Sequence, residues 1–93
     1  MSNKYSHDLR KMLESESVRP TDEVRIVVKC RKGESVKRAR SAIEQSGGKI
    51  VYEMELSESE YRFDVKIKKD MVAGIALSDD VLSMGMPKFL HTT

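Results

Sequence analysis

The segment from Tyr61 to Lys68 constrains the fold most, because it alternates apolar and charged residues more cleanly than any other part of the chain. One set of alternate positions is apolar and the other is charged: Tyr61, Phe63, Val65 and Ile67 against Arg62, Asp64, Lys66 and Lys68. Since successive side chains of a strand point to opposite faces, the pattern predicts a strand with one buried and one wet face. Such a strand needs a sheet beside it and a second layer over its apolar side.

Three further segments have the same period of two, at 24–30, 50–56 and 81–86. In the first, we expect the inward residues to be Val24, Ile26, Val28 and Cys30. In the second, one face should carry Ile50, Tyr52, Met54 and Leu56, and the other Val51, Glu53 and Glu55. In the last, the inward residues should be Leu82, Met84 and Met86. A polar turn at 57–60 should join the second and third strands.

Two segments have apolar residues at helical spacing. Ser35 is expected to cap a helix with a stripe at Val36, Ala39, Ala42 and Ile43, ended by Gly47-Gly48. Asp70 is expected to cap a second helix with its stripe at Met71, Val72, Ile75 and Ala76 or Leu77. The order is then β-α-β-β-α-β over 24–86. It predicts an α+β, ferredoxin-like domain, in which a four-stranded antiparallel sheet carries two helices on one face.

The length of 93 residues leaves room for one small domain. We expect residues 1–23 to be a polar segment and linker, in which Leu9, Met12 and Leu13 have the spacing of a short helix. This segment could dock on the open sheet face or act as a tether. Residues 24–87 should form the ferredoxin-like domain, and residues 88–93, which follow Pro87, should be a C-terminal tail.

Charge and cysteine content place limits on partners and compartment. The net charge of +2 does not by itself indicate a polyanion partner. The single cysteine, Cys30, excludes an intrachain disulfide and fits a reducing compartment. No stretch has the length and apolar character of a signal peptide or a membrane span, so we expect a cytoplasmic protein. A zinc site from Cys30, His7 and His91 would need both ends of the chain to converge, so we expect no metal and no cofactor.

The sequence does not indicate catalysis. The polar residues predicted on the open face alternate in sign, which is typical of cross-strand ion pairs: Arg25, Lys29, Glu53, Glu55, Arg62, Asp64, Lys66 and Lys68. The predicted domain has no histidine, no serine or cysteine with an evident base, and no glycine-rich phosphate loop. The segment RKGES after the first strand is too short for the phosphate loop of an acylphosphatase. We therefore expect no catalytic residues.

RNA binding and small-molecule binding are two other functions that a sheet of this kind can have. An RNA-binding sheet needs aromatic residues on its open face, and Tyr61 and Phe63 fall in register with the core instead. The basic residues at Lys29, Arg31, Lys32, Lys37, Arg38 and Arg40 are typical of a solvated surface, so nucleic acid is not the expected partner. Regulatory domains of the ACT type share the strand order and bind ligands near a glycine after the first strand, where this chain has Gly33. An oligomeric small-molecule-binding regulatory domain is therefore the alternative function.

Four short motifs, in order along 24–86, resemble the subtilisin propeptide and proteinase-inhibitor family. They are Ile26-Val27-Val28, Gly47-Gly48-Lys49-Ile50, Phe63-Asp64-Val65 and Ser78-Asp79-Asp80-Val81. The chain departs from the family at Tyr61-Arg62, where an asparagine-glycine pair is usual. It departs again at Met84-Gly85-Met86-Pro87, where acidic residues usually follow the last strand. Residues 1–23 have no counterpart.

The resemblance implies a non-catalytic protein-binding module, an inhibitor or intramolecular-chaperone-like partner of a subtilisin-type serine protease. In the family, the open sheet face packs on two surface helices of the protease. The corresponding residues here are Val27, Lys29, Val51, Glu53, Arg62 and Asp64. The tail then enters the active-site cleft as a substrate-like strand, which here would be Phe89, Leu90, His91, Thr92 and Thr93. With Thr93 in the primary specificity pocket, Leu90 would fall where such proteases take a large apolar residue.

Overall fold

The structure is a computed structural model that describes residues 4–87. Its helices are α1 (His7–Glu14), α2 (Glu34–Gln45), the short 3-10 helix η1 (Lys69–Met71) and α3 (Val72–Ala76). Its strands are β1 (Glu23–Arg31), β2 (Lys49–Glu55), β3 (Glu60–Lys68) and β4 (Val81–Gly85). The strands form one antiparallel sheet in the order β2-β3-β1-β4. This confirms the predicted α+β class, and the strand order is compatible with a ferredoxin-like fold.

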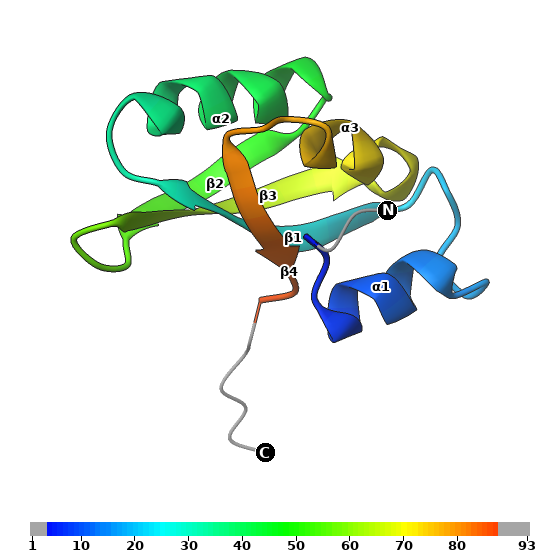
Figure 1. Cartoon of the computed structure of the whole chain (residues 1–93). Coiled ribbons are helices and arrows are strands. Elements are labelled where there is room, and N and C mark those ends of the chain that lie inside the picture. The colour runs from blue at the N-terminus through cyan, green and yellow to red at the C-terminus, as the bar shows by residue number, and fades with distance from the viewer. Residues whose placement is uncertain (1–3, 88–93) are drawn as a thin grey trace.

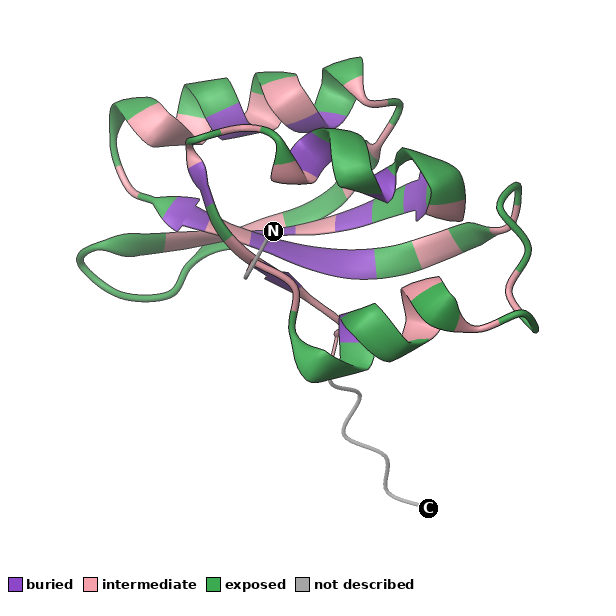
Figure 2. Cartoon of the chain, turned by 45° about the vertical axis from the view of Figure 1, so that its right-hand side comes forward, coloured by how far each residue is buried: buried purple, intermediate pink, exposed green. Residues whose placement is uncertain are grey.

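The core lies between one face of the sheet and the two helices α2 and α3, which lie on the same side of it (Figure 1). Six of the alternate residues of β1 and β3 that point to this side are at most 1% exposed: Ile26, Val28, Cys30, Phe63, Val65 and Ile67. They meet Ala39 and Ile43 of α2 and Val72 and Ile75 of α3, all fully buried. Figure 2 shows the buried positions along the middle of the sheet and the exposed positions on the outer sides of the helices. We call the sheet side opposite α2 and α3 the open face.

The central strands β1 and β3 pair without interruption. The register runs from Glu23 opposite Lys68 to Arg31 opposite Glu60. The alternation predicted for both strands is therefore confirmed, with Phe63 and Val65 inside and Arg62 and Asp64 on the open face.

The edge strand β2 is interrupted by one extra residue. Ile50 pairs with Val65, whereas Tyr52 pairs with the adjacent residue Asp64, so Val51 is a bulge. Because a one-residue slip reverses the two faces of a strand, Tyr52 and its successors point opposite to the prediction. The expectation that Tyr52, Met54 and Leu56 share the buried face with Ile50 is wrong, and these three are exposed.

The other edge strand, β4, has a similar irregularity. Val81 lies opposite Cys30, and Ser83 lies opposite Lys29, so Leu82 is the extra residue. Val81 and Met84 are buried, whereas Leu82 is 37% exposed. The predicted inward position of Met84 is confirmed, and that of Leu82 is wrong.

The N-terminal segment docks on the outer edge of β4. The backbone N–H of Ser6 donates to Met84 O (2.8 Å), and that of Met84 donates to Lys4 O (2.7 Å). Tyr5 forms a parallel bridge with Met84 at this edge. The Ser6 hydroxyl then caps α1 by accepting from the N–H of Leu9, and Leu9 is fully buried in the common core. Residues 4–14 therefore cover a sheet edge that would otherwise present unpaired backbone groups.

The ends of the other helices follow the prediction in part. Gly33, at φ 97°, precedes α2, and Ser35 lies inside the helix, so the predicted Ser35 cap is wrong. Asp70 lies within η1 and makes no capping bond, so the second predicted cap is also wrong. Gly47, at φ 88°, follows the end of α2 as predicted, since glycine takes this backbone conformation without strain.

Candidate partner-binding face

The open face consists of three rows of side chains that cross the strands. The cross-strand pairs define the first row as Lys49, Lys66 and Arg25. The second row is Tyr52, Asp64, Val27 and Gly85, and the third is Met54, Arg62, Lys29 and Ser83. Adjacent strands lie about 4.8 Å apart, so neighbours within a row are close enough to contact one partner together.

Four of the six residues predicted on this face lie together in the second and third rows: Val27, Lys29, Arg62 and Asp64. Arg62 binds Asp64 through two hydrogen bonds, from Nε (2.7 Å) and from Nη2 (3.2 Å). Val27 has the predicted orientation but is only 5% exposed. The expected pair of wet valines is therefore wrong for Val27, and Val51 at the bulge is the more exposed of the two, at 36%.

The placement of Glu53 on the open face is wrong, because the β2 bulge turns it toward α2. Glu53 accepts hydrogen bonds from Arg40 Nε (3.3 Å) and Nη2 (2.5 Å). It also accepts one from the Tyr61 hydroxyl (2.8 Å). Hydrogen bonds from Arg40 lower the pKa of the Glu53 carboxyl, and the Glu53 carboxylate raises the pKa of Tyr61. These contacts join α2, β2 and β3, so the role of Glu53 here is structural.

Tyr52 and Met54 are the residues of this face that the sequence analysis missed. Tyr52 is 56% exposed, and Met54 is 38% exposed. The expectation that the open face carries no aromatic ring is therefore wrong. The segment alternates apolar and polar residues on both sides of Val51, so the pattern contains no signal for the bulge that turns Tyr52 outward.

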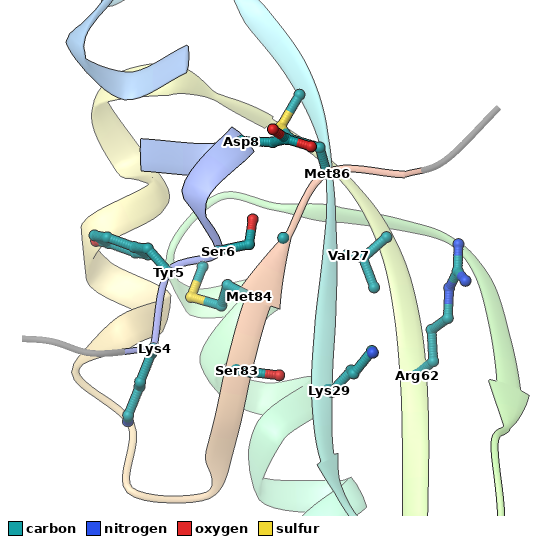
Figure 3. A pocket seen from close by; sticks show the side chains of 11 residues that line it. Lys4, Tyr5, Ser6, Asp8, Val27, Lys29, Arg62, Ser83, Met84 and Met86 are labelled. Carbon is teal, nitrogen blue, oxygen red and sulfur yellow. The ribbon is translucent and has the colours of Figure 1, made fainter. Parts of the chain in front are cut away.

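A hollow of about 470 Å³ opens where the open face meets the N-terminal segment (Figure 3). Its sheet side is formed by Val27, Lys29 and Arg62, and Ser6 and Asp8 line the other side. The hollow combines an apolar floor with both signs of charge at its rim.

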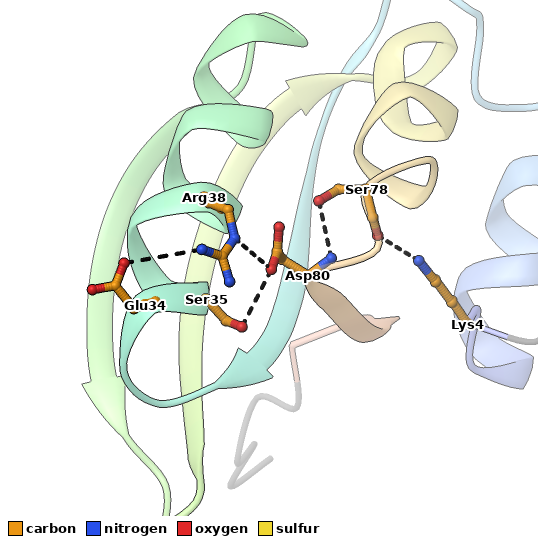
Figure 4. A network of polar contacts seen from close by, with 6 residues as sticks. All are labelled: Lys4, Glu34, Ser35, Arg38, Ser78 and Asp80. Atoms are coloured by element: carbon orange, nitrogen blue, oxygen red, sulfur yellow. Dashed lines mark hydrogen bonds and ion pairs between the residues drawn. The ribbon is translucent and has the colours of Figure 1, made fainter.

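A polar network fixes the turn that leads into β4 (Figure 4). Asp80 accepts hydrogen bonds from Arg38 Nε (2.9 Å) and from the Ser35 hydroxyl (3.3 Å), both in α2. Lys4 Nζ donates to the backbone oxygen of Ser78 (2.6 Å) from the other side. Because both flanks of the turn are held, the direction of β4 is set relative to the rest of the domain.

The predicted tail residues lie outside the described part of the chain: Phe89, Leu90, His91, Thr92 and Thr93. The last described residue is Pro87, which follows β4 after one residue.

Metal-ligating and nucleophilic side chains are the other groups in residues 4–87 that could carry chemistry. That range contains no group of three or more His, Cys, Asp or Glu side chains that could hold a metal ion. Cys30 is fully buried in the core. This burial is the main cause that raises the pKa of its thiol, and the negative charge of Asp80 is the second. A thiol in that environment is a poor nucleophile, so Cys30 is a packing residue.

Two further observations concern membrane crossing and similarity to known proteins. No helix within residues 4–87 combines the length and apolar character that crossing a bilayer requires. No protein-family model, curated protein or solved structure matches this chain.

Proposed function

We propose that this chain is a non-catalytic protein-binding module that acts on a subtilisin-type serine protease, as an inhibitor or as a folding assistant. The observation that carries the proposal is the arrangement of the open face. Val27, Lys29, Arg62 and Asp64, which the family resemblance assigns to the protease interface, lie together on the sheet side that α2 and α3 leave uncovered. Tyr52 and Met54 extend the same surface toward the β2 edge.

The tail supplies the second contact in this proposal. Residues 88–93 span roughly 20 Å when extended, long enough to reach from a docked domain into a neighbouring cleft. An extended segment can bind as an added strand, with main-chain hydrogen bonds for affinity and side chains for selection. Leu90 would occupy an apolar subsite. Two linked contacts bind more tightly than either alone, because the second becomes intramolecular.

Rigidity of the domain supports inhibition rather than simple cleavage. The turn before β4 is held by Asp80 and Lys4, and the outer edge of β4 is paired with residues 4–6. A preorganised domain loses little conformational entropy on docking, so a tail attached to it leaves slowly. The single buried Cys30 fits a reducing compartment, so we place the complex in the cytoplasm.

The test is a titration against a panel of purified subtilisin-type proteases, scoring both inhibition and cleavage of the tail. Deletion of residues 88–93, or Leu90→Asp, should abolish inhibition and leave the Tm unchanged. Leu77→Asp is the matched control, because Leu77, the C-cap residue of α3, is 84% exposed and lies away from the tail in sequence. Inhibition of no panel member, or inhibition that survives the deletion, would sink the proposal. A dimer whose Tm rises with a small metabolite would instead favour the ACT-type alternative.

A further inference from the structure

The first row of the open face places three cations side by side on three strands. Lys66 of β3 lies directly opposite Arg25 of β1 on one side and opposite Lys49 of β2 on the other. All three side chains are exposed. Within residues 4–87, none of them takes part in an ion pair. We call this set the cationic row.

The charge is concentrated in the middle of the sheet and not at its ends. At the two ends of the β1–β3 ladder, opposite charges face each other: Glu23 with Lys68, and Arg31 with Glu60. The three rows between them carry five cations and one carboxylate. Their net charge of +4 exceeds the +2 of the whole chain, so the remainder of the protein is net negative.

Like charges directly opposite on neighbouring strands destabilise a sheet. The cationic row contains two such pairs, and within residues 4–87 none of its three side chains forms an ion pair that would offset them. At the two ends of the β1–β3 ladder, by contrast, residues of opposite charge face each other. Repulsion kept at the centre of an exposed face is therefore explained best by an anionic partner that removes it on binding.

We propose that the open face docks on an acidic patch of a protein partner, with the cationic row contacting its carboxylates. This inference rests on the proposed function, which it deepens by naming the chemistry of the partner's surface. Tyr52, 56% exposed beside the cationic row, supplies apolar contact and a hydroxyl at the same interface. Electrostatic attraction of this kind acts chiefly on the rate of association.

The composition of the second and third rows favours a protein over a nucleic acid. Sheets that bind single-stranded RNA stack two or three bases on aromatic rings, whereas the described residues of this face include one ring, that of Tyr52. Met54, which is 38% exposed, suits the apolar contacts of a protein interface.

The decisive variant is Lys66→Glu, compared with Lys37→Glu as a control of identical charge change on the exposed side of α2. Lys66→Glu should raise the Tm slightly, because it converts both repulsive pairs of the row into attractive ones. If the measured Tm of Lys66→Glu is not below that of wild type, a weaker interaction in this variant does not result from misfolding. Against a protease that the panel shows to be inhibited, Lys66→Glu should slow association about ten-fold at low salt. The difference should shrink at high salt, and Lys37→Glu should change the rate less than about two-fold.

A second arm needs no protease. Poly-L-glutamate added to the intact chain should shift the backbone amide resonances of the three rows, and Lys66→Glu should remove those shifts. If no protease is inhibited but these shifts occur, the proposed protease function fails and the acidic-partner inference stands. If a protease is inhibited equally by wild type and Lys66→Glu, the inference fails and the proposed function stands. Absence of shifts overturns the inference. The inference is also overturned if a single-stranded oligouridylate binds the open face more tightly than poly-L-glutamate does and Tyr52→Ala weakens that binding.

Discussion

The central strands and the edge strands of this sheet differ in regularity. β1 and β3 keep one register from Glu23–Lys68 to Arg31–Glu60, whereas β2 and β4 each contain one irregularity. A central strand is hydrogen-bonded on both sides, so an extra residue would disturb two ladders. An edge strand has one free side, where the extra residue can bulge.

The central strands and the edge strand β2 therefore have different roles in the structure. The central strands hold the core, because their alternate residues contact α2 and α3 without interruption. The edge strand β2 determines the character of the open face. The bulge at Val51 brings Tyr52 to that face and turns Glu53 away from it, toward Arg40. One inserted residue thus removes a carboxylate from a surface that is already rich in cations.

The largest contrast between the two kinds of strand should come from single-residue deletions. Deleting Val51 removes the bulge but leaves Ile50 and Tyr52 with their present partners, so the change in the free energy of unfolding should be at most about 1 kcal/mol. Deleting Asp64 from β3 reverses the faces of half a central strand and should abolish cooperative unfolding. Thermal unfolding followed by circular dichroism checks both. Similar losses in the two deletions would show that the bulge is as essential as the central register.

For the open face, the sequence predicts side-chain orientation correctly on the central strands and wrongly on the edge strand β2. Lys29, Arg62 and Asp64 were placed on the correct face because they belong to central strands, where burial forces strict alternation. Glu53 and Tyr52 were exchanged because the segment from Lys49 to Glu55 alternates through the bulge. No local residue preference marks the bulge. It becomes visible only when Glu53 is seen to bind Arg40 and Tyr61, which are distant in the sequence.

The surface on which the N-terminal segment docks could not be predicted from the sequence either. Leu9 was recognised as part of a short apolar stripe, but nothing in that stripe indicates which surface it covers. The answer depends on β4 having a free outer edge, to which residues 4–6 can pair. That edge exists only once the whole sheet is assembled.

The second contrast compares two aromatic residues on opposite faces. Phe63→Ala on β3 removes a fully buried ring and should lower the free energy of unfolding by about 3–5 kcal/mol. Tyr52→Ala on β2 removes a ring that is 56% exposed, and should change it by less than about 1 kcal/mol. Urea denaturation measures both. A loss in Tyr52→Ala as large as that in Phe63→Ala would mean that the open face is buried against something in the free protein.

The third contrast concerns the glycine pair that leads into β2. A Cβ at Gly48 would lie 2.9 Å from both Ile43 Cγ2 and Val65 Cγ1, so Gly48→Ala forces the core apart. We expect it to destabilise the protein by about 2 kcal/mol, within the range for overpacking. Gly47→Ala meets no atom within 4 Å but strains a backbone at φ 88°, and should destabilise by about 1 kcal/mol. A loss in Gly48→Ala no larger than that in Gly47→Ala would mean that Ile43 and Val65 move aside for the added methyl group at little cost. The comparison uses urea midpoints at constant m-value.

The smallest effect should come from the charge that the β2 bulge directs inward. Hydrogen bonds from Arg40, and also one from Tyr61, lower the pKa of Glu53 in the folded state. The carboxylate form is therefore favoured by folding, and its contribution is complete above the unfolded pKa of about 4.3. It is lost as the pH falls through the lower folded value. We expect Glu53→Gln to reduce the free energy of unfolding at neutral pH by about 1 kcal/mol.

The pH dependence distinguishes this contact from a general loss of packing. Between about pH 5 and pH 3, wild type should lose stability more steeply than Glu53→Gln, so the two should converge in acid. Glu58→Gln, in the exposed turn between β2 and β3, is the matched control and should follow wild type throughout. If Glu53→Gln instead remained less stable by a constant amount down to pH 3, the carboxylate charge would not matter. The contact of Glu53 with Arg40 and Tyr61 would then stabilise β2 through the shape and hydrogen bonding of the side chain, and not through its charge. Charge would then matter only on the open face.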